Sequence, residues 1–147
     1  MEEATANNEI VVGAIDLGSN TFRLLVARIE VNGIFVLHKR NVTVQLGHSL
    51  SATDGLSADT INNGLAVLAE FKEELDRYRV NCYRCCGTEA LRKAVNAEVF
   101  IAEAAKNLSI KVEVLSGREE ALLSCRGVLS SMTGNTFSLT LEWQQVF

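Results

Sequence analysis

The first third of the chain consists of apolar runs separated by short turns, a pattern typical of β-strands that follow one another directly. Residues 9–16 are almost continuously apolar, which predicts a strand covered on both faces. Residues 21–31 and 34–46 form two further β-like runs, and the Asn32-Gly33 pair between them favours a tight hairpin. The pattern therefore predicts a three-stranded meander at the start of the fold.

The remainder of the chain changes to helical spacing and then alternates strands with helices. After a polar loop over 47–55, Ser57 can cap a long helix whose apolar residues recur every three or four positions as far as Tyr78. Four more elements follow: a buried strand over 80–87, a helix over 97–107 that Asn96 can cap, a half-buried strand over 110–115, and a final helix from Ser116 with Leu122, Cys125, Leu129 and Met132 on one side. This alternation predicts an α/β layered domain.

Composition places the chain among ordinary globular domains. Of its 147 residues, 48% are hydrophobic, and 14 Lys and Arg against 18 Asp and Glu leave a net charge of −4. An acidic balance argues against a nucleic-acid-binding surface, which usually concentrates Lys and Arg. No apolar run approaches the roughly 20 residues of a bilayer span, and the acidic start lacks the features of a secretory signal. We therefore expect a cytoplasmic protein with no membrane and no nucleic-acid partner.

The four cysteines allow three interpretations. Cys82 and Cys85 have the CxxC spacing of some metal sites, with Cys86 and Cys125 as further thiols. In a strand over 80–87, however, residues three apart point to opposite faces and do not hold one ion. Buried, reduced thiols are therefore favoured over a zinc site, and a thiol switch is the remaining alternative.

Composition also divides the chain into three parts. Residues 1–9 form an acidic, polar N-terminal tail, and residues 10–132 carry the strands and helices of the domain. Residues 133–147 hold the only Trp and alternate apolar with polar positions, which indicates an additional strand.

A candidate phosphate loop follows the first predicted strand. Asp16 ends that strand, and the loop Gly18-Ser19-Asn20-Thr21 offers backbone N–H groups, hydroxyls and a close backbone approach at glycine. Asp16 can hold a water or a hydrated metal ion, and Arg23 can bind phosphate oxygens through two parallel hydrogen bonds. A plain hairpin, with Arg23 as a solvent-exposed charge, explains the same residues equally well.

Two further segments place polar residues at predicted helix starts. Thr88 follows the glycine that ends the buried strand, and Arg92 lies one turn into a short helix whose first N–H groups can meet an anion. The local alternative makes Thr88 an N-cap and Arg92 a surface residue. Ser116 and Glu119 fit the capping box S-x-x-E, which leaves Glu120 to orient or deprotonate a water. The local alternative for Glu120 is one more first-turn acid.

These three segments occur together, and in this order, in a known enzyme family. The chain resembles the N-terminal domain of the exopolyphosphatase and guanosine pentaphosphate phosphohydrolase (Ppx/GppA) family over residues 11–132. The motifs that carry the resemblance are A-I-D-L-G-S-N-T-F-R-L from Ala14, G-T-E-A-L-R-K-A from Gly87 and S-G-R-E-E-A from Ser116. The resemblance implies a ribonuclease H-like fold of the actin, heat-shock ATPase and sugar-kinase superfamily, of which this chain carries the first of two lobes.

The resemblance also implies roles for individual residues. The residues that would line the phosphate cleft are Asp16, Gly18, Ser19, Asn20, Thr21, Arg23 and Thr88. Arg92 would neutralise phosphate oxygens, and Glu120 would be the general base that positions water. Mg²⁺ would screen the charge of the substrate, with Asp16 as a ligand through water. The substrate would be inorganic polyphosphate, which would lose orthophosphate from its end, or guanosine pentaphosphate, which would lose its 5′ γ-phosphate.

The sequence departs from this family near its end. The family's second phosphate loop, D-x-G-G-G-S, has no counterpart in residues 133–147. One lobe can hold a phosphate but cannot enclose it, so we expect weak hydrolysis or none from this chain alone. The alternatives are a non-catalytic module that binds polyphosphate or a guanosine alarmone, or pairs with a relative, and a sugar-kinase-like phosphotransferase lobe. An exposed inter-domain face would also favour a homodimer.

Overall fold

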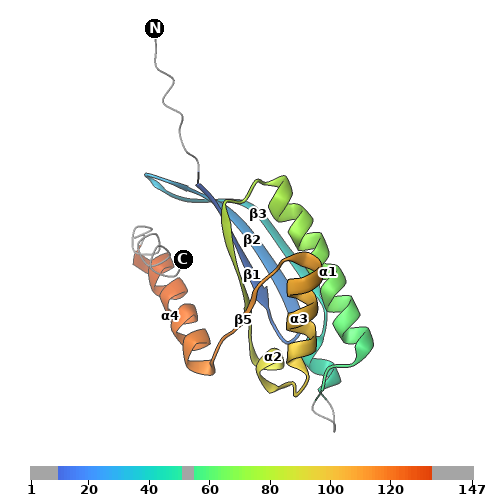
Figure 1. Ribbon diagram of the computed structural model, residues 1–147. Helices are drawn as coiled ribbons and strands as arrows, with labels where there is room; N and C mark the ends of the chain where they lie inside the picture. Colours follow the sequence, from blue (N-terminus) through green and yellow to red (C-terminus); the bar gives the residue numbers. More distant parts are fainter. Residues whose placement is uncertain (1–9, 51–54, 134–147) are drawn as a thin grey trace.

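The computed structural model describes residues 10–50 and 55–133, which fold around a five-stranded mixed sheet (Figure 1). The strands are β1 (Ile10–Leu17), β2 (Thr21–Glu30), β3 (Gly33–Thr43), β4 (Cys82–Gly87) and β5 (Val112–Val114), in the spatial order β3-β2-β1-β4-β5. The helices are α1 (Ala58–Arg77), α2 (Glu89–Lys93), α3 (Ala97–Leu108) and α4 (Gly117–Thr133), and a 3-10 turn, η1, covers Leu46–Ser49. The predicted meander, followed by alternating helices and strands, is confirmed.

The sheet joins an antiparallel half to a parallel half at β1. This strand pairs antiparallel with β2 and parallel with β4, because β2 and β3 return through tight turns whereas β4 and β5 each follow a helical crossover. Between β2 and β3 the chain turns at Asn32, and Gly33 follows with a φ of 147°, which glycine adopts without steric cost. The hairpin expected from this dipeptide is therefore confirmed.

The core lies between the sheet and the helices α1 and α3, which cover the same face (Figure 1). Its largest fully buried side chains are Phe22, Phe71, Phe100, Ile15, Leu17, Leu24, Leu46, Leu68, Leu75, Leu91, Ile110 and Val26. Phe22 of β2 and Phe100 of α3 pack edge to face, with 6.3 Å between ring centroids and 69° between ring planes, an arrangement that the ring quadrupoles favour. The other face of the sheet, which we call the open face, lies on the α4 side (Figure 1).

Gly64 allows α1 to pack closely against this aromatic pair. A Cβ atom at this position would lie 2.9 Å from Cε2 of Phe100 and 3.5 Å from Cε2 and Cζ of Phe22. We expect Gly64→Ala to lower the free energy of unfolding by about 1 kcal/mol, because overpacking outweighs the gain in helix propensity. Gly127→Ala in α4 is the control, since its Cβ would meet no atom within 4 Å. Urea unfolding followed by circular dichroism measures both variants, and unchanged or higher stability of Gly64→Ala would contradict this packing.

Two predicted helix caps have different outcomes. The Ser57 hydroxyl accepts a hydrogen bond from the Thr60 N–H at 3.1 Å, so this N-cap is confirmed. Asn96 occupies the N-cap position of α3, but its side chain makes no capping hydrogen bond there, so that prediction is wrong. Its amide instead accepts from the Leu56 N–H at 2.7 Å and donates to the Leu56 carbonyl at 2.9 Å. These two backbone bonds outcompete the cap and attach the segment before α1 to the start of α3.

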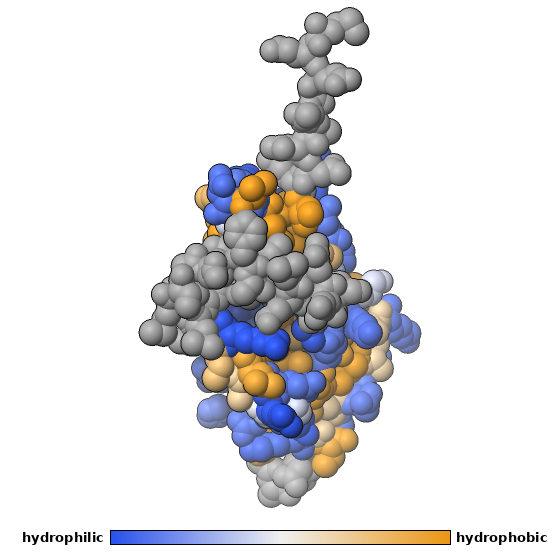
Figure 2. All heavy atoms as spheres, turned by 90° about the vertical axis from the view of Figure 1, so that its left-hand side faces the viewer, coloured by the Kyte–Doolittle hydropathy of each residue, from blue (hydrophilic) through white to orange (hydrophobic). Residues whose placement is uncertain are grey.

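Helix α4 forms as predicted, but its predicted apolar side is not buried. Leu122 is 49% exposed, and Cys125 is exposed as well. The physical reason is that the helix faces a cavity rather than packed side chains, so residues 121–127 are all exposed. Figure 2 views the molecule from this side, where hydrophilic and hydrophobic residues interleave over the described surface. The predictions for 1–9 and, apart from Thr133 at the end of α4, for 133–147 lie outside the described residues, as do the side chains of Leu129 and Met132.

Three of the four cysteines lie in β4, and all four are free thiols. Cys82 pairs with Val12 and Cys85 with Ile15, so the pleat turns these two thiols to opposite faces. Burial is the main cause that raises the pKa of Cys85 and that of Cys86, and at Cys86 the Arg84 guanidinium acts in the opposite direction without cancelling it. Both thiols are therefore protonated and poorly nucleophilic at neutral pH.

Candidate functional site

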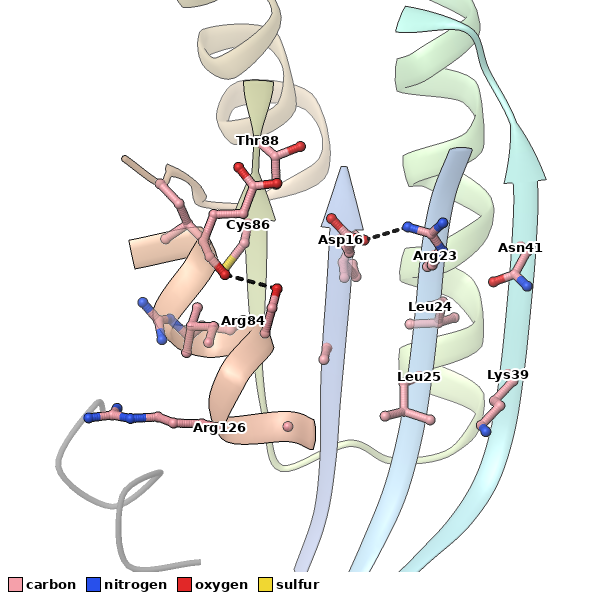
Figure 3. Close-up of a pocket in the computed structure, with 17 residues that line it drawn as sticks. Asp16, Arg23, Leu24, Leu25, Lys39, Asn41, Arg84, Cys86, Thr88 and Arg126 are labelled. Atoms are coloured by element: carbon pink, nitrogen blue, oxygen red, sulfur yellow. Dashed lines mark hydrogen bonds and ion pairs between the residues drawn. The ribbon is translucent and has the colours of Figure 1, made fainter. Parts of the chain in front are cut away.

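The register between β1 and β2 places a carboxylate beside a guanidinium on the open face. Asp16 and Arg23 are direct partners in the antiparallel ladder, so their side chains lie on the same face. Nη1 of Arg23 donates to Oδ2 of Asp16 at 2.8 Å, with the two side chains 57% and 44% exposed (Figure 3). Because both groups stay accessible, an anion that reaches this point can bind Arg23 in competition with Asp16.

The loop between β1 and β2 is tight because of Gly18. A Cβ atom at this position would lie 2.8 Å from the Thr21 carbonyl oxygen. The carbonyl of Ser19 accepts a hydrogen bond from the Gly47 N–H at 2.7 Å, and that of Asn20 accepts from the N–H groups of residues 44 and 45, both at 2.9 Å. The loop carbonyls are thus occupied by the segment after β3, and the Asn20 amide donates to the Thr21 hydroxyl at 3.4 Å.

Thr88 and Arg92 connect the end of β4 to the ends of β1 and β5. Thr88 stands at the N-cap position of α2, as the local alternative expected, but its buried hydroxyl donates to the Leu17 carbonyl at 3.3 Å and makes no capping hydrogen bond. Nη1 of Arg92 donates to the Leu115 carbonyl at 2.6 Å and to Oε2 of Glu120 at 3.2 Å. Arg92 is therefore not a simple surface residue, because it positions the side chain of Glu120.

The two acids at the start of α4 have different surroundings. The Ser116 N–H donates to Oε2 of Glu119 at 2.8 Å, and the Glu119 N–H donates to the Ser116 hydroxyl at 3.2 Å, which confirms the capping box. The backbone hydrogen bond from Ser116 is the main cause that holds the pKa of Glu119 below its usual range. Glu120 takes no part in the cap, and its side chain, 39% exposed, turns to Arg92 instead.

A cavity of about 650 Å³ between the open face and α4 brings most of these groups together. Asp16, Arg23, Thr88 and Glu120 all line it. Its other lining residues are Ala14, Ile15, Leu24, Leu25, Lys39, Asn41, Arg84, Cys86, Leu115, Leu123, Ser124, Arg126 and Gly127 (Figure 3). Asp16 and Thr88 line the cavity where β1 and β4 end, and further along the sheet the apolar Ala14 and Leu25 lie between Arg84 and Lys39. We call it the main cavity.

The structure separates the remaining predicted phosphate-binding residues from this group. Ser19 and Asn20 line a second cavity, of about 590 Å³, together with Gly47, His48, Leu50, Glu89, Ala90 and Lys93. Gly18 and Thr21 line neither of these two cavities. The set predicted from sequence is therefore divided between two adjoining spaces, one on each side of the β1–β2 loop.

Sequence reasoning missed the contributions of β3 and β4 to the main cavity. Asn41 pairs with Arg23 and Lys39 pairs with Leu25 across the β2–β3 ladder. Counting back from the hairpin turn alone would pair Arg23 with Arg40, but a bulge between Val26 and Ala27 shifts the register by one residue. No signal in the sequence marks this bulge. On β4, the alternation that turns Cys85 inward could have identified Arg84 and Cys86 as open-face residues.

Arg84 is fixed by a carboxylate of the neighbouring edge strand. Its Nε donates to both oxygens of Glu113, at 3.3 and 3.2 Å, and its Nη2 donates to Oε2 at 2.9 Å. This forked hydrogen bond is the main cause that holds the pKa of Glu113 below its usual range, against the opposing effect of burial. The Arg84 charge is thus neutralised within the protein.

The donors in the main cavity fit a weakly held Mg²⁺ rather than a closed metal cage. Asp16 and Glu120 each use one carboxylate oxygen in an ion pair, and Asn41 and Thr88 add uncharged oxygens nearby. Within residues 10–50 and 55–133, no three His, Cys, Asp or Glu side chains are close enough to hold a metal ion. Mg²⁺ usually keeps several waters and is bound through one or two carboxylates together with substrate phosphates. This arrangement suits that mode of binding.

The strand order, with helices on both sides and polar groups at the carboxyl ends of the central strands, defines a lobe of the ribonuclease H-like, actin-like fold. Residues 25–142 match the Ppx/GppA phosphatase family, and the chain belongs to that family. It is 35% identical over 129 residues to the guanosine-5′-triphosphate,3′-diphosphate pyrophosphatase of Photobacterium profundum. The aligned region covers 88% of this chain but only 26% of that protein.

Solved structures of the same family share the fold. The Aquifex aeolicus family member has a TM-score of 0.72 and 31% identity, over 74% of this chain and 36% of that one. An exopolyphosphatase from Cytophaga hutchinsonii has a TM-score of 0.74 and 32% identity, over 77% of this chain and 36% of that one. The chain thus spans about a third of these relatives, as one lobe of the fold does. None of the helices in the described part of the chain is long and apolar enough to cross a membrane.

Proposed function

We propose that this chain is the N-terminal lobe of a phosphoanhydride hydrolase that releases orthophosphate from the end of inorganic polyphosphate. The observation that carries the proposal is the pair of accessible carboxylate–guanidinium contacts at one cavity. Asp16 and Arg23 provide one contact from the sheet and both line the cavity. Glu120, which also lines it, provides the other contact at the start of α4, with Arg92, which is not itself a lining residue, as its partner. A terminal phosphate between them meets two cations, and a water beside it meets a carboxylate.

In the proposed reaction the chain's own residues bind, orient and accept a proton. Arg23 and Arg92 stabilise charge on the terminal phosphate, which is the main demand of phosphoryl transfer. Glu120 accepts a proton from the attacking water while the oxygen of that water bonds to the terminal phosphorus. The bridging P–O bond breaks, and its electron pair leaves with the shortened chain. Mg²⁺, held by Asp16 and Glu120 through water, would neutralise phosphate oxygens when bound.

Guanosine pentaphosphate is the second candidate substrate. The Photobacterium profundum relative is named for hydrolysis of a guanosine polyphosphate. Apolar side chains of the main cavity, among them Ala14, Leu25 and Leu123, also suit the apolar faces of a nucleoside. In this alternative the 5′ γ-phosphate of guanosine pentaphosphate occupies the position proposed for the terminal phosphate of polyphosphate.

A non-catalytic role in binding or pairing is the alternative of another class. Leu122 and Leu123 of α4 are 49% and 40% exposed, and a second copy of the chain could cover them in a homodimer. The free thiols fit the reducing environment of the cytoplasm, where we place the protein. Phosphate release that is lost when Glu120 is replaced would favour the hydrolase over the non-catalytic binding module.

Arg23→Gln tests the phosphate-binding part of the proposal. We expect this variant to bind tripolyphosphate about tenfold more weakly than the wild-type chain, as expected when a charge-assisted contact is lost. Arg28→Gln is the matched control, because Arg28 lies further along β2 and pairs with Glu30 instead. Isothermal titration calorimetry measures both affinities. Equal affinity of Arg23→Gln and wild type would contradict the assignment of the main cavity.

A further inference from the structure

Lys39 is a cation of the main cavity without an acidic partner among the described residues. The other basic side chains there are engaged: Arg23 pairs with Asp16 and Arg84 with Glu113, and Arg126 also has an interaction. The exposed Lys39 ammonium has no hydrogen bond or ion pair within the described part of the chain. An uncompensated cation in a cavity attracts an anion more strongly than a neutralised one.

The ladders place Lys39 in line with the site proposed for the terminal phosphate. Asn41, Arg23 and Asp16 stand side by side on β3, β2 and β1 (Figure 3). Lys39 lies two residues before Asn41 on the same face, which corresponds to roughly 7 Å along the strand. Its direct ladder partner is Leu25, which is apolar. A path from Asp16 across the open face of β2 and β3 therefore passes an amide and then a free ammonium.

The opposite direction is less favourable for a polyanion. On the β4 and β5 side of Asp16, the open-face ladder leads through Cys86 to Glu113. Glu113 is ionised and paired with Arg84, so the open-face ladder on that side presents a thiol and then a carboxylate, and the nearby Lys111 lies under the negative charge of Glu113. A polyphosphate whose terminal unit lies between Asp16 and Glu120 therefore makes its most favourable electrostatic contacts when its remaining units run towards the β3 edge.

We infer that Lys39 and Asn41 form a subsite for the internal phosphates of the polyphosphate chain, next to the site of its terminal phosphate. This inference rests on the proposed function. Lys39 contributes charge, and the Asn41 amide donates to a phosphate oxygen. Pyrophosphate is too short to occupy both the terminal site and the position of Lys39. Lys39 therefore strengthens the binding of long chains and leaves the binding of pyrophosphate nearly unchanged.

The test compares two ligands with four forms of the 147-residue chain. Calorimetry at 150 mM salt, where screening limits non-specific attraction, measures the affinity for pyrophosphate and for long-chain polyphosphate. The variants are Lys39→Gln, Lys39→Arg and, as matched control, Lys106→Gln, which removes an exposed lysine from α3 on the other side of the sheet. We expect Lys39→Gln to weaken long-chain binding about fivefold, the size of one exposed charge contact. Lys39→Arg restores it, and Lys106→Gln changes little.

The outcomes separate this inference from the proposed function. An equal loss for both ligands in Lys39→Gln, or an equal loss of long-chain binding in Lys106→Gln, overturns the subsite. If Lys39→Gln changes nothing while Arg23→Gln still weakens both ligands, the proposed function stands and the subsite fails. If the wild-type chain binds neither ligand, the proposed function fails and the subsite fails with it. Backbone amide shifts of Lys39 and Asn41 that appear only with the long chain support the subsite.

Discussion

Replacement of Glu120 by Gln is expected to lower the rate of phosphate release from long-chain polyphosphate by a factor of about 100 or more. The Gln amide keeps the size of the side chain and can still accept the hydrogen bond from Arg92, but it cannot take a proton from water. The substitution therefore removes proton transfer and leaves the geometry of the contact. We expect slow turnover by the wild-type chain, because one lobe does not exclude water from the phosphate, so the assay uses high protein concentration and added Mg²⁺.

Glu119→Gln is the matched control for this experiment. Glu119 is adjacent in sequence but caps α4 through Ser116 instead of lining the main cavity. Its variant is expected to retain activity within about threefold of the wild-type rate, as for a surface change outside the site. Equal rates for Glu120→Gln and wild type would contradict the role of Glu120. Absence of phosphate release by the wild-type chain would favour the binding module over the hydrolase.

Glu74→Ala is expected to lower the free energy of unfolding by about 3 kcal/mol at neutral pH, since it leaves the Arg40 guanidinium with only the exposed Glu70 as a partner and removes the carboxylate that contacts His38. Glu74 lies in α1 with a side chain only 10% exposed. His38 of β3 contacts its Oε2 at 2.6 Å, and Nη1 of Arg40 donates to its Oε1. Arg40 also lies over the Phe71 ring, 5.8 Å from its centroid, and His38 stacks on Tyr78. This network attaches the edge strand β3 to α1.

The matched control for this network is Glu70→Ala. Glu70 contacts the same Arg40 from one turn earlier in α1, but its side chain is 52% exposed. An exposed pair of this kind contributes little, so we expect a loss of about 0.5 kcal/mol or less. Chemical unfolding of both variants and of the wild type measures the difference. Similar losses for Glu74→Ala and Glu70→Ala would contradict the importance of burial in this network.

The cost of Glu74→Ala should also depend on pH. Burial raises the pKa of Glu74, but the hydrogen bonds from Arg40 and His38 outweigh it and hold the pKa below its ordinary value of 4.5. A carboxyl group with a lowered pKa in the folded state stabilises the protein above its unfolded pKa and loses that effect as the pH falls through the folded value. The difference between wild type and Glu74→Ala is therefore expected to be largest above about pH 5 and to shrink towards pH 3.

The fold was predictable because its signals are local. The apolar runs, the hairpin at Asn32-Gly33 and the Ser57 cap each depend on a few consecutive residues, and the structure confirms all three, although the turn itself is formed by Val31 and Asn32. The capping box at Ser116 is equally local, and it also identified Glu120 by elimination. Where the prediction failed, a tertiary contact competed with a local one. Asn96 bonds to the Leu56 backbone instead of capping its own helix.

The site was predictable only in part, because it combines residues from several strands. The motifs supplied Asp16, Arg23 and Glu120, but not the fact that Arg92 holds the Glu120 carboxylate. That contact depends on where the end of β5 lies relative to α2. Lys39 and Asn41 reach the main cavity through a register that includes a bulge. Bulges depend on the fit between strands and leave no mark in a single sequence.

We propose that the main cavity, lined by Asp16, Arg23 and Glu120, holds the phosphate on which the protein acts. A crystal structure of the chain soaked with tungstate, an analogue of phosphate with strong anomalous scattering, tests it most directly. We expect the strongest anomalous peak to lie in the main cavity, in contact with the Arg23 guanidinium. A strongest peak in the second cavity, beside Ser19, Asn20 and Lys93, or no peak in the main cavity, would contradict it.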